Sequence, residues 1–110
     1  LACAAALATL ETILDEGILE NCRKVGAYFL SRLGELKNKH PRIREVRGQG
    51  LILAVELTVP GAEFVDKCME KGLLINCTNG NVLRFVPPLI LTRQDVERAI
   101  GILDGALEEK

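Results

Sequence analysis

One short run of the sequence, Asn81–Leu89, constrains the fold more than any other. It reads Asn-Val-Leu-Arg-Phe-Val-Pro-Pro-Leu, so an arginine stands in the middle of a strand-type segment that ends in two prolines. Side chains alternate between the two faces of a strand, which places Leu83 and Phe85 on one face and Arg84 on the other. Burying an unpaired guanidinium is very costly. If Leu83 and Phe85 pack under helices, Arg84 therefore lies on the opposite face.

Arg84 has two interpretations from its local sequence. A guanidinium on a rigid strand can bind a planar carboxylate through paired hydrogen bonds, and Pro87 and Pro88 stiffen the exit of this strand. Alternatively, the stem of Arg84 packs while its head reaches water or an internal Asp or Glu. The sequence shows no paired carboxylates, no Ser/His or Cys/His arrangement and no metal cluster to accompany it. The residues alone thus predict a well-placed arginine and not a complete active site.

Four segments have the apolar spacing of helices. Apolar residues recur three and four positions apart in them, and Thr92 is suited to cap the last one. Gly72 is expected to follow the end of the third helix. The expected helices are Leu1–Glu16, Ile18–Lys37, Ala62–Lys71 and Arg93–Glu108.

Four further segments have the character of strands. The expected strands are Ile43–Arg47, Leu51–Leu57, Leu73–Cys77 and Asn81–Val86. Gly48-Gln49-Gly50 predicts a bulge or tight bend between the first two, and Asn79-Gly80 predicts a hairpin turn between the last two. The order of elements favours an α+β fold, in which helices pack on one face of a mainly antiparallel sheet of about four strands. The other face would be open, with Arg84 on it.

Composition restricts the partners that the chain can have. Tryptophan is absent, aromatic residues make up 4% and the net charge is -1, which argues against nucleic-acid binding. No apolar run approaches the roughly 18 residues that a membrane span needs. Four cysteines without a Cys-x-x-Cys pair, and His40 as the one histidine, argue against a zinc site. We expect Cys3, Cys22, Cys68 and Cys77 to be buried, reduced side chains, as in a cytoplasmic protein.

The first residues resemble the apolar stretch of a signal peptide only superficially. Leu1–Ala8 has no basic residue or methionine before it, and it continues without a break into the helical spacing of Thr9–Glu16. We interpret this stretch as a helix that is cut open at its start. The chain is therefore expected to be part of a longer protein.

Several runs resemble class III aminotransferases, which depend on pyridoxal phosphate and have fold type I. Gly72–Thr78 followed by Asn81–Leu89 resembles the C-terminal part of the acetylornithine aminotransferase family. Val46–Leu51 with Glu56-Leu57 resembles the strand–Gly-x-Gly–strand segment of the class. Leu1–Ala6 resembles the helix that follows its Gly-Gly-Asn-Pro motif. The resemblance thus runs the whole length of the chain, in the same order.

The resemblance implies a role for Arg84. It falls on the class's conserved arginine, which binds the α-carboxylate of the amino or keto acid. Residues 1–110 would form a single C-terminal domain, whereas the cofactor-binding large domain would lie upstream of Leu1. None of the lysines in this chain lies in the Schiff-base motif (Lys24, Lys37, Lys39, Lys67, Lys71 and Lys110). We therefore expect no catalytic residue here, no bound cofactor and no activity of the isolated chain. Arg47 is expected to be structural.

For the whole enzyme, the resemblance implies transfer of an amino group from N-acetylornithine to 2-oxoglutarate. This reaction belongs to arginine biosynthesis, and the enzyme would be a cytoplasmic homodimer. Ornithine, succinylornithine and 4-aminobutyrate are alternative substrates within the class. A non-catalytic α+β module that binds an amino acid through Arg84 is the alternative outside it.

Overall fold

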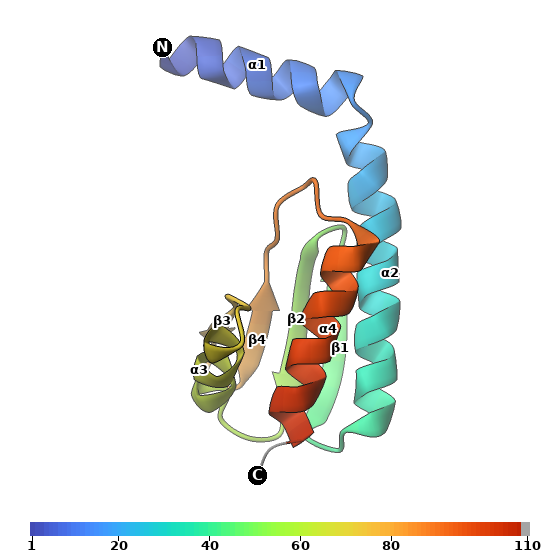
Figure 1. Ribbon diagram of the computed structural model, residues 1–110, viewed down its shortest axis with the longest axis vertical. Coiled ribbons are helices and arrows are strands. Elements are labelled where there is room, and N and C mark those ends of the chain that lie inside the picture. The colour runs from blue at the N-terminus through green and yellow to red at the C-terminus, as the bar shows by residue number, and fades with distance from the viewer. Residues whose placement is uncertain (109–110) are drawn as a thin grey trace.

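The computed structural model describes residues 1–108, which form four helices and four strands (Figure 1). Lys110 lies outside the described residues. The elements are α1 (Ala2–Asp15), α2 (Ile18–Lys39), β1 (Ile43–Gln49), β2 (Ile52–Leu57), α3 (Ala62–Glu70), β3 (Asn76–Thr78), β4 (Val82–Phe85) and α4 (Arg93–Glu108). Their order is the order expected from the sequence, and the predicted α+β class is confirmed.

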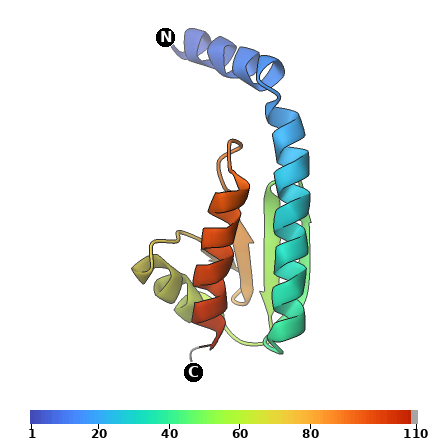
Figure 2. The same ribbon diagram turned by 45° about the vertical axis from the view of Figure 1, so that its right-hand side comes forward.

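The four strands form one antiparallel sheet in the order β1-β2-β4-β3. Helix α2 packs on β1 and on α4, while α3 packs on α4 and β3. Figures 1 and 2 show α2 and α4 on the same side of the strands. No described helix covers the opposite face of the sheet, so the two faces differ as the sequence predicts.

The core lies between the helices and the covered face of the sheet. Leu83 is fully buried and Phe85 is 4% exposed, whereas Arg84 between them is exposed, which confirms the predicted alternation. The rings of Phe29 on α2 and Phe85 on β4 meet edge to face, with centroids 5.6 Å apart. The other largest fully buried side chains are Leu33, Leu53, Val55, Leu57, Cys68, Val96 and Leu103.

The turn between β1 and β2 is shorter than the break expected at Gly48-Gln49-Gly50. Strand β1 continues through Gly48 to Gln49, which pairs with Ile52, so the turn consists of Gly50 and Leu51 alone. Gly50 has φ +58°, a left-handed conformation that favours glycine. The tight bend is therefore confirmed, but it lies one step later in the chain, after Gln49.

Strand β3 is shorter than predicted. Only Asn76–Thr78 pair with β4, and Leu73–Ile75 form no strand. The reason lies in the partner strand, because β4 ends at Phe85 and the following Pro87 and Pro88 have no amide hydrogen to donate. The predicted hairpin turn is confirmed, since Asn79 and Gly80 both have positive φ, 50° and 78°.

Two helix ends follow their predicted signals. The Thr92 hydroxyl accepts a hydrogen bond from the Asp95 amide at 3.2 Å, and the Asp95 carboxylate accepts one from the Thr92 amide at 3.0 Å. These reciprocal bonds cap α4. The hydrogen bonds that the Asp95 carboxylate accepts from the Thr92 amide and from the Thr92 hydroxyl lower the pKa of Asp95. Gly72, with φ +93°, follows α3, and the Leu73 amide bonds back to the Cys68 carbonyl.

Helix α1 projects away from the rest of the described chain (Figure 1). None of its residues is buried, and Leu7, Leu10 and Leu14 are exposed. The prediction that every cysteine is buried is wrong for Cys3, because it lies on this uncovered helix. Cys68 is buried, Cys22 and Cys77 are half-buried, and all four thiols are free. None of the helices formed by the described residues is long and apolar enough to cross a membrane.

Candidate functional site: the open face of the sheet

The pairing of the strands aligns four side chains in a row around Arg84. Arg47 on β1 lies opposite Ala54 on β2, Ala54 opposite Arg84 on β4, and Arg84 opposite Asn76 on β3. Directly opposed residues in antiparallel strands point to the same face. This row therefore lies on the open face, with the small side chain of Ala54 between the two arginines.

Arg84 is exposed and held on a strand between two others. Its neighbours Leu83 and Phe85 are anchored in the core, which fixes the backbone from which the guanidinium extends. Within residues 1–108, no hydrogen bond or ion pair engages the Arg84 guanidinium. The alternative interpretation had the head of Arg84 reach water or an internal Asp or Glu; among these residues no Asp or Glu pairs with it, and its side chain is exposed to solvent. Its donors remain free for a ligand.

A hollow of about 600 Å³ adjoins Arg84 on the open face. It is lined by Arg47, Gly48, Gln49, Ile52, Leu53, Ala54, Thr78, Asn79, Val82 and Arg84. Both charged groups in this lining are arginines, and the amides of Gln49 and Asn79 add further hydrogen-bonding groups. The chemistry of the lining suits a small anion, above all a carboxylate that takes two parallel hydrogen bonds from a guanidinium.

Two glutamates share the open face with these arginines. Glu45 and Glu56 lie directly opposite each other on β1 and β2, an arrangement that repels unless cations balance it. The Arg47 guanidinium lies 3.3 Å from the Glu45 carboxylate and 3.5 Å from that of Glu56, and Arg44 lies 3.4 Å from Glu56. Arg47, expected to be structural, is therefore part of an ion-pair group at the β1 side of the hollow.

This ion-pair group was not recognised from the sequence. The segment that contains Glu56 reads as a mostly buried strand, and nothing local shows which cations Glu56 meets. The signal that could have revealed the group is Glu56 itself, a glutamate within an otherwise apolar run. Such a charged side chain must either face the open side of the sheet or form an ion pair in the interior.

The lining of the hollow offers no lysine and no aspartate. A Schiff-base cofactor needs a lysine amine, and pyridoxal phosphate also needs a partner for its pyridine nitrogen. Among the described lysines, Lys39 pairs with Asp104 and Glu108, and Lys67 pairs with Glu63. The lining of this hollow therefore does not by itself fit this cofactor, whereas its two arginines suit a carboxylate.

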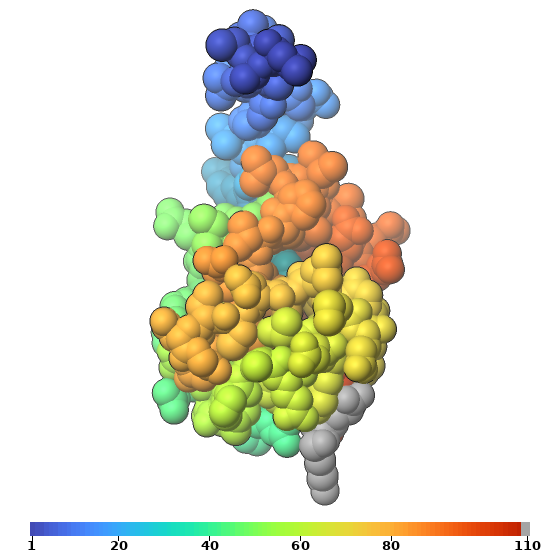
Figure 3. Space-filling view, turned by 90° about the vertical axis from the view of Figure 1, so that its left-hand side faces the viewer, coloured from blue at the N-terminus to red at the C-terminus, as the bar shows by residue number. Residues whose placement is uncertain are grey.

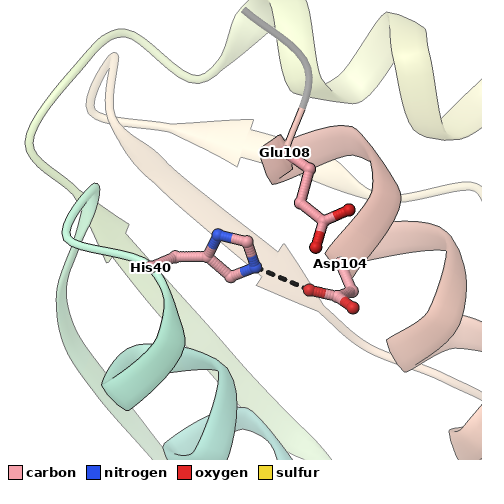
Figure 4. Close-up of side chains that lie close together, drawn as sticks. All are labelled: His40, Asp104 and Glu108. Carbon is pink, nitrogen blue, oxygen red and sulfur yellow. Dashed lines mark hydrogen bonds and ion pairs between the residues drawn. The ribbon is translucent and has the colours of Figure 1, made fainter.

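A second group of polar side chains lies at the C-terminal ends of α2 and α4 (Figure 4). His40 is buried, and its Nε2 lies 2.6 Å from the Asp104 carboxylate. Ligand atoms of His40, Asp104 and Glu108 lie within 4.8 Å of one another, a spacing that a metal ion could bridge. The Lys39 ammonium, however, lies 2.9 Å from both carboxylates and supplies the positive charge. Lys39 and His40 at the end of α2 therefore link this helix to Asp104 and Glu108 on α4, and we call these four residues the interhelical clasp.

Asp104→Asn is expected to destabilise the folded protein by about 1 kcal/mol at pH 7. The hydrogen bond from His40, followed by that from Lys39, lowers the pKa of Asp104 below its ordinary value of 3.8. The contribution of a carboxyl whose folded pKa is depressed is complete at neutral pH, and it is lost as pH falls below about 3.8. Thermal midpoints of wild type and variant should thus differ at pH 7 and converge in acid. A constant difference would contradict this assignment.

A second hollow, of about 450 Å³, lies on the helical side of the molecule. Figure 3 shows it between the yellow segment 72–75 and the orange segment 86–91, with atoms of α2 at its base. Its lining is mostly apolar, and its charged residues are Asp95 and Arg98. Asp95 already caps α4, whereas Arg98 is exposed and, within residues 1–108, makes no side-chain hydrogen bond or ion pair. This hollow therefore offers one free guanidinium in a mostly apolar lining, and the open-face hollow offers Arg84 beside further polar groups.

Known proteins are similar to this chain in sequence along nearly its whole length. The aminotransferase class-III family model matches residues 1–107. An acetylornithine aminotransferase of Caldanaerobacter subterraneus subsp. tengcongensis is 47% identical over 110 residues, which are 99% of this chain and 28% of that protein. The chain thus spans less than a third of the length of the relatives that it matches.

Solved structures show the same fold. The acetylornithine aminotransferase from Elizabethkingia anophelis superposes with a TM-score of 0.90 at 32% identity, over 96% of this chain and 29% of that one. An ornithine aminotransferase from Toxoplasma gondii, in which PLP partially occupies the active site, has a TM-score of 0.87 at 34% identity, over 96% and 26% of the two chains. The resemblance noted in the sequence is confirmed along nearly its whole length: the chain belongs to the class-III aminotransferase family.

Proposed function

We propose that the protein containing this chain is a pyridoxal-phosphate-dependent aminotransferase, and that Arg84 binds the carboxylate of its substrates. The observation that carries the proposal is an exposed guanidinium on a strand anchored in the core, beside a hollow, with no carboxylate partner among the described residues. Family membership supplies the reaction class. Residues 1–110 then serve as a C-terminal domain, and the remaining groups of the active site come from the rest of the protein.

In this proposal the chain contributes binding and orientation. Pyridoxal phosphate, when bound, supplies the electron sink for amino transfer. Arg84 grips the carboxylate through two parallel hydrogen bonds, which fixes the direction of the bond that must react at the adjacent carbon. A rigid strand suits this task because small displacements of a bound substrate reduce the rate strongly. The isolated chain, without a cofactor-binding lysine in its hollow, is then inactive.

N-acetylornithine is the proposed amino donor and 2-oxoglutarate the proposed acceptor, which places the enzyme in arginine biosynthesis. The support is the 47% identity to an acetylornithine aminotransferase. Ornithine is the main competitor, because an ornithine aminotransferase shares the fold at 34% identity. We further propose that the enzyme works as a cytoplasmic homodimer. A non-catalytic amino-acid-binding module is less well supported, because the family match extends through residues 1–107.

The test uses the full-length protein purified with its cofactor. On addition of N-acetylornithine without a keto acid, the cofactor absorbance is expected to shift from the pyridoxal to the pyridoxamine form. Ornithine, succinylornithine and 4-aminobutyrate, added separately at equal concentration, should react more slowly. A faster response to one of these would reassign the donor. Absence of any bound cofactor would favour the binding module, and activity of residues 1–110 alone would contradict the proposed division of roles.

A further inference from the structure

Glu56 lies between two arginines that could each neutralise it. On the open face, Ala54 is flanked by Arg47 on β1 and by Arg84 on β4, and Glu56 stands two residues further along β2. It is therefore the diagonal neighbour of both arginines. Diagonal neighbours across antiparallel strands are roughly 7–8 Å apart at Cα, which is within reach of these long side chains. By position alone, Glu56 could pair with either.

The structure pairs Glu56 with the arginines of β1. Its carboxylate lies 3.4 Å from Arg44 and 3.5 Å from Arg47. A bulge explains why β1 offers two cations, because Arg44 and Glu45 together oppose the single residue Glu56 at the register shift after Ile43. The Glu56 side chain is only 22% exposed, so water screens these pairs less than fully exposed ones.

The direction of Glu56 determines what a ligand meets at Arg84. A carboxylate turned toward β4 would occupy guanidinium donors that a substrate carboxylate needs, and its negative charge would repel that substrate. A carboxylate held toward β1 leaves Arg84 open, as it is within residues 1–108.

We propose that Glu56 is held away from Arg84 by Arg44 and Arg47, and that these two arginines act as positioning residues for carboxylate binding. The inference rests on the proposed role of Arg84. Arg44 and Arg47 need not touch the substrate, since they act through Glu56. Their removal frees Glu56 to pair with Arg84 as an internal competitor of the substrate carboxylate.

The test compares variants of the full-length holoenzyme with the unreactive dicarboxylate glutarate as the probe. Arg44→Gln combined with Arg47→Gln is expected to raise the dissociation constant of glutarate about tenfold, and the KM for 2-oxoglutarate in parallel, at low ionic strength. Adding Glu56→Gln should restore both values to within about twofold of wild type, because the competitor has lost its charge. The thermal midpoint of each variant, together with the rescue itself, separates this effect from misfolding. The loss should shrink at high salt.

The effect of adding Glu56→Gln decides whether Arg44 and Arg47 act through Glu56. If binding stays weak after Glu56→Gln is added, Arg47 or Arg44 contacts the ligand directly or supports the fold, and the inference is wrong. Unchanged binding in the double arginine variant would also overturn it. Arg84→Gln, measured beside them, reports on the proposed function separately: if it binds glutarate as tightly as wild type, the role of Arg84 itself is wrong.

Discussion

Arg84→Gln in the full-length protein is expected to lower kcat/KM for both the amino donor and the keto acid by about 100-fold. A hydrogen bond to a charged group contributes about 1.5–3 kcal/mol. Loss of a bidentate pair, taken as roughly 3 kcal/mol, corresponds to about 100-fold because every 1.36 kcal/mol is about tenfold in rate. Both substrates should be affected, since each carries a carboxylate beside its reacting carbon. Steady-state kinetics with each substrate varied in turn provides the measurement.

Two further variants show whether the expected loss of kcat/KM comes from the geometry of the Arg84 guanidinium or from its charge. Arg84→Lys keeps the positive charge but lacks the planar fork, so it should recover only part of the lost rate. Arg23→Gln removes an arginine that is 77% exposed on α2 and paired with Glu20, and it serves as the matched control without an expected kinetic effect. Full recovery by lysine would indicate a long-range charge effect. If Arg23→Gln lowers kcat/KM as much as Arg84→Gln does, the loss is not specific to Arg84 and the proposed carboxylate contact is wrong.

The position of Arg84 was predictable because it depends on local alternation. Leu83 and Phe85 need burial, and the period of a strand then forces Arg84 to the other face. Helix α4 was predictable for a similar reason, since the Thr92 cap and an apolar stripe lie within a few residues of each other. Each of these signals is short in range, so neither depends on how distant parts of the chain meet.

The surroundings of Arg84 were not predictable in the same way. The partners of Glu56 depend on the register of β1 against β2 and on a bulge, and a shift of one residue would turn these side chains to the other face. The clasp joins His40 to Asp104, which are 64 residues apart in the chain. Strand β3 is short because its partner ends before two prolines. In each case the determining contact is made by a distant segment.

Gly26→Ala is expected to destabilise the protein by about 1–3 kcal/mol, the usual range for overpacking a close contact. Gly26 lies on α2 where this helix meets the turn of the β1–β2 hairpin. A Cβ atom there would overlap the carbonyl oxygen of Gly50 and lie 2.6 Å from its carbonyl carbon. Because the obstacle is backbone, no side-chain rotation relieves it, and α2 or the hairpin must move.

Gly34→Ala on the same helix is the matched control for this prediction. A Cβ atom at Gly34 meets nothing within 4 Å, so alanine there should stabilise the helix by up to about 1 kcal/mol through its higher propensity. The two substitutions add the same methyl group and should shift the thermal midpoint in opposite directions. The hairpin also carries Arg47, so Gly26→Ala should weaken carboxylate binding while Gly34→Ala does not. Equal shifts in the two midpoints would show that α2 does not depend on the close approach of Gly26 to Gly50.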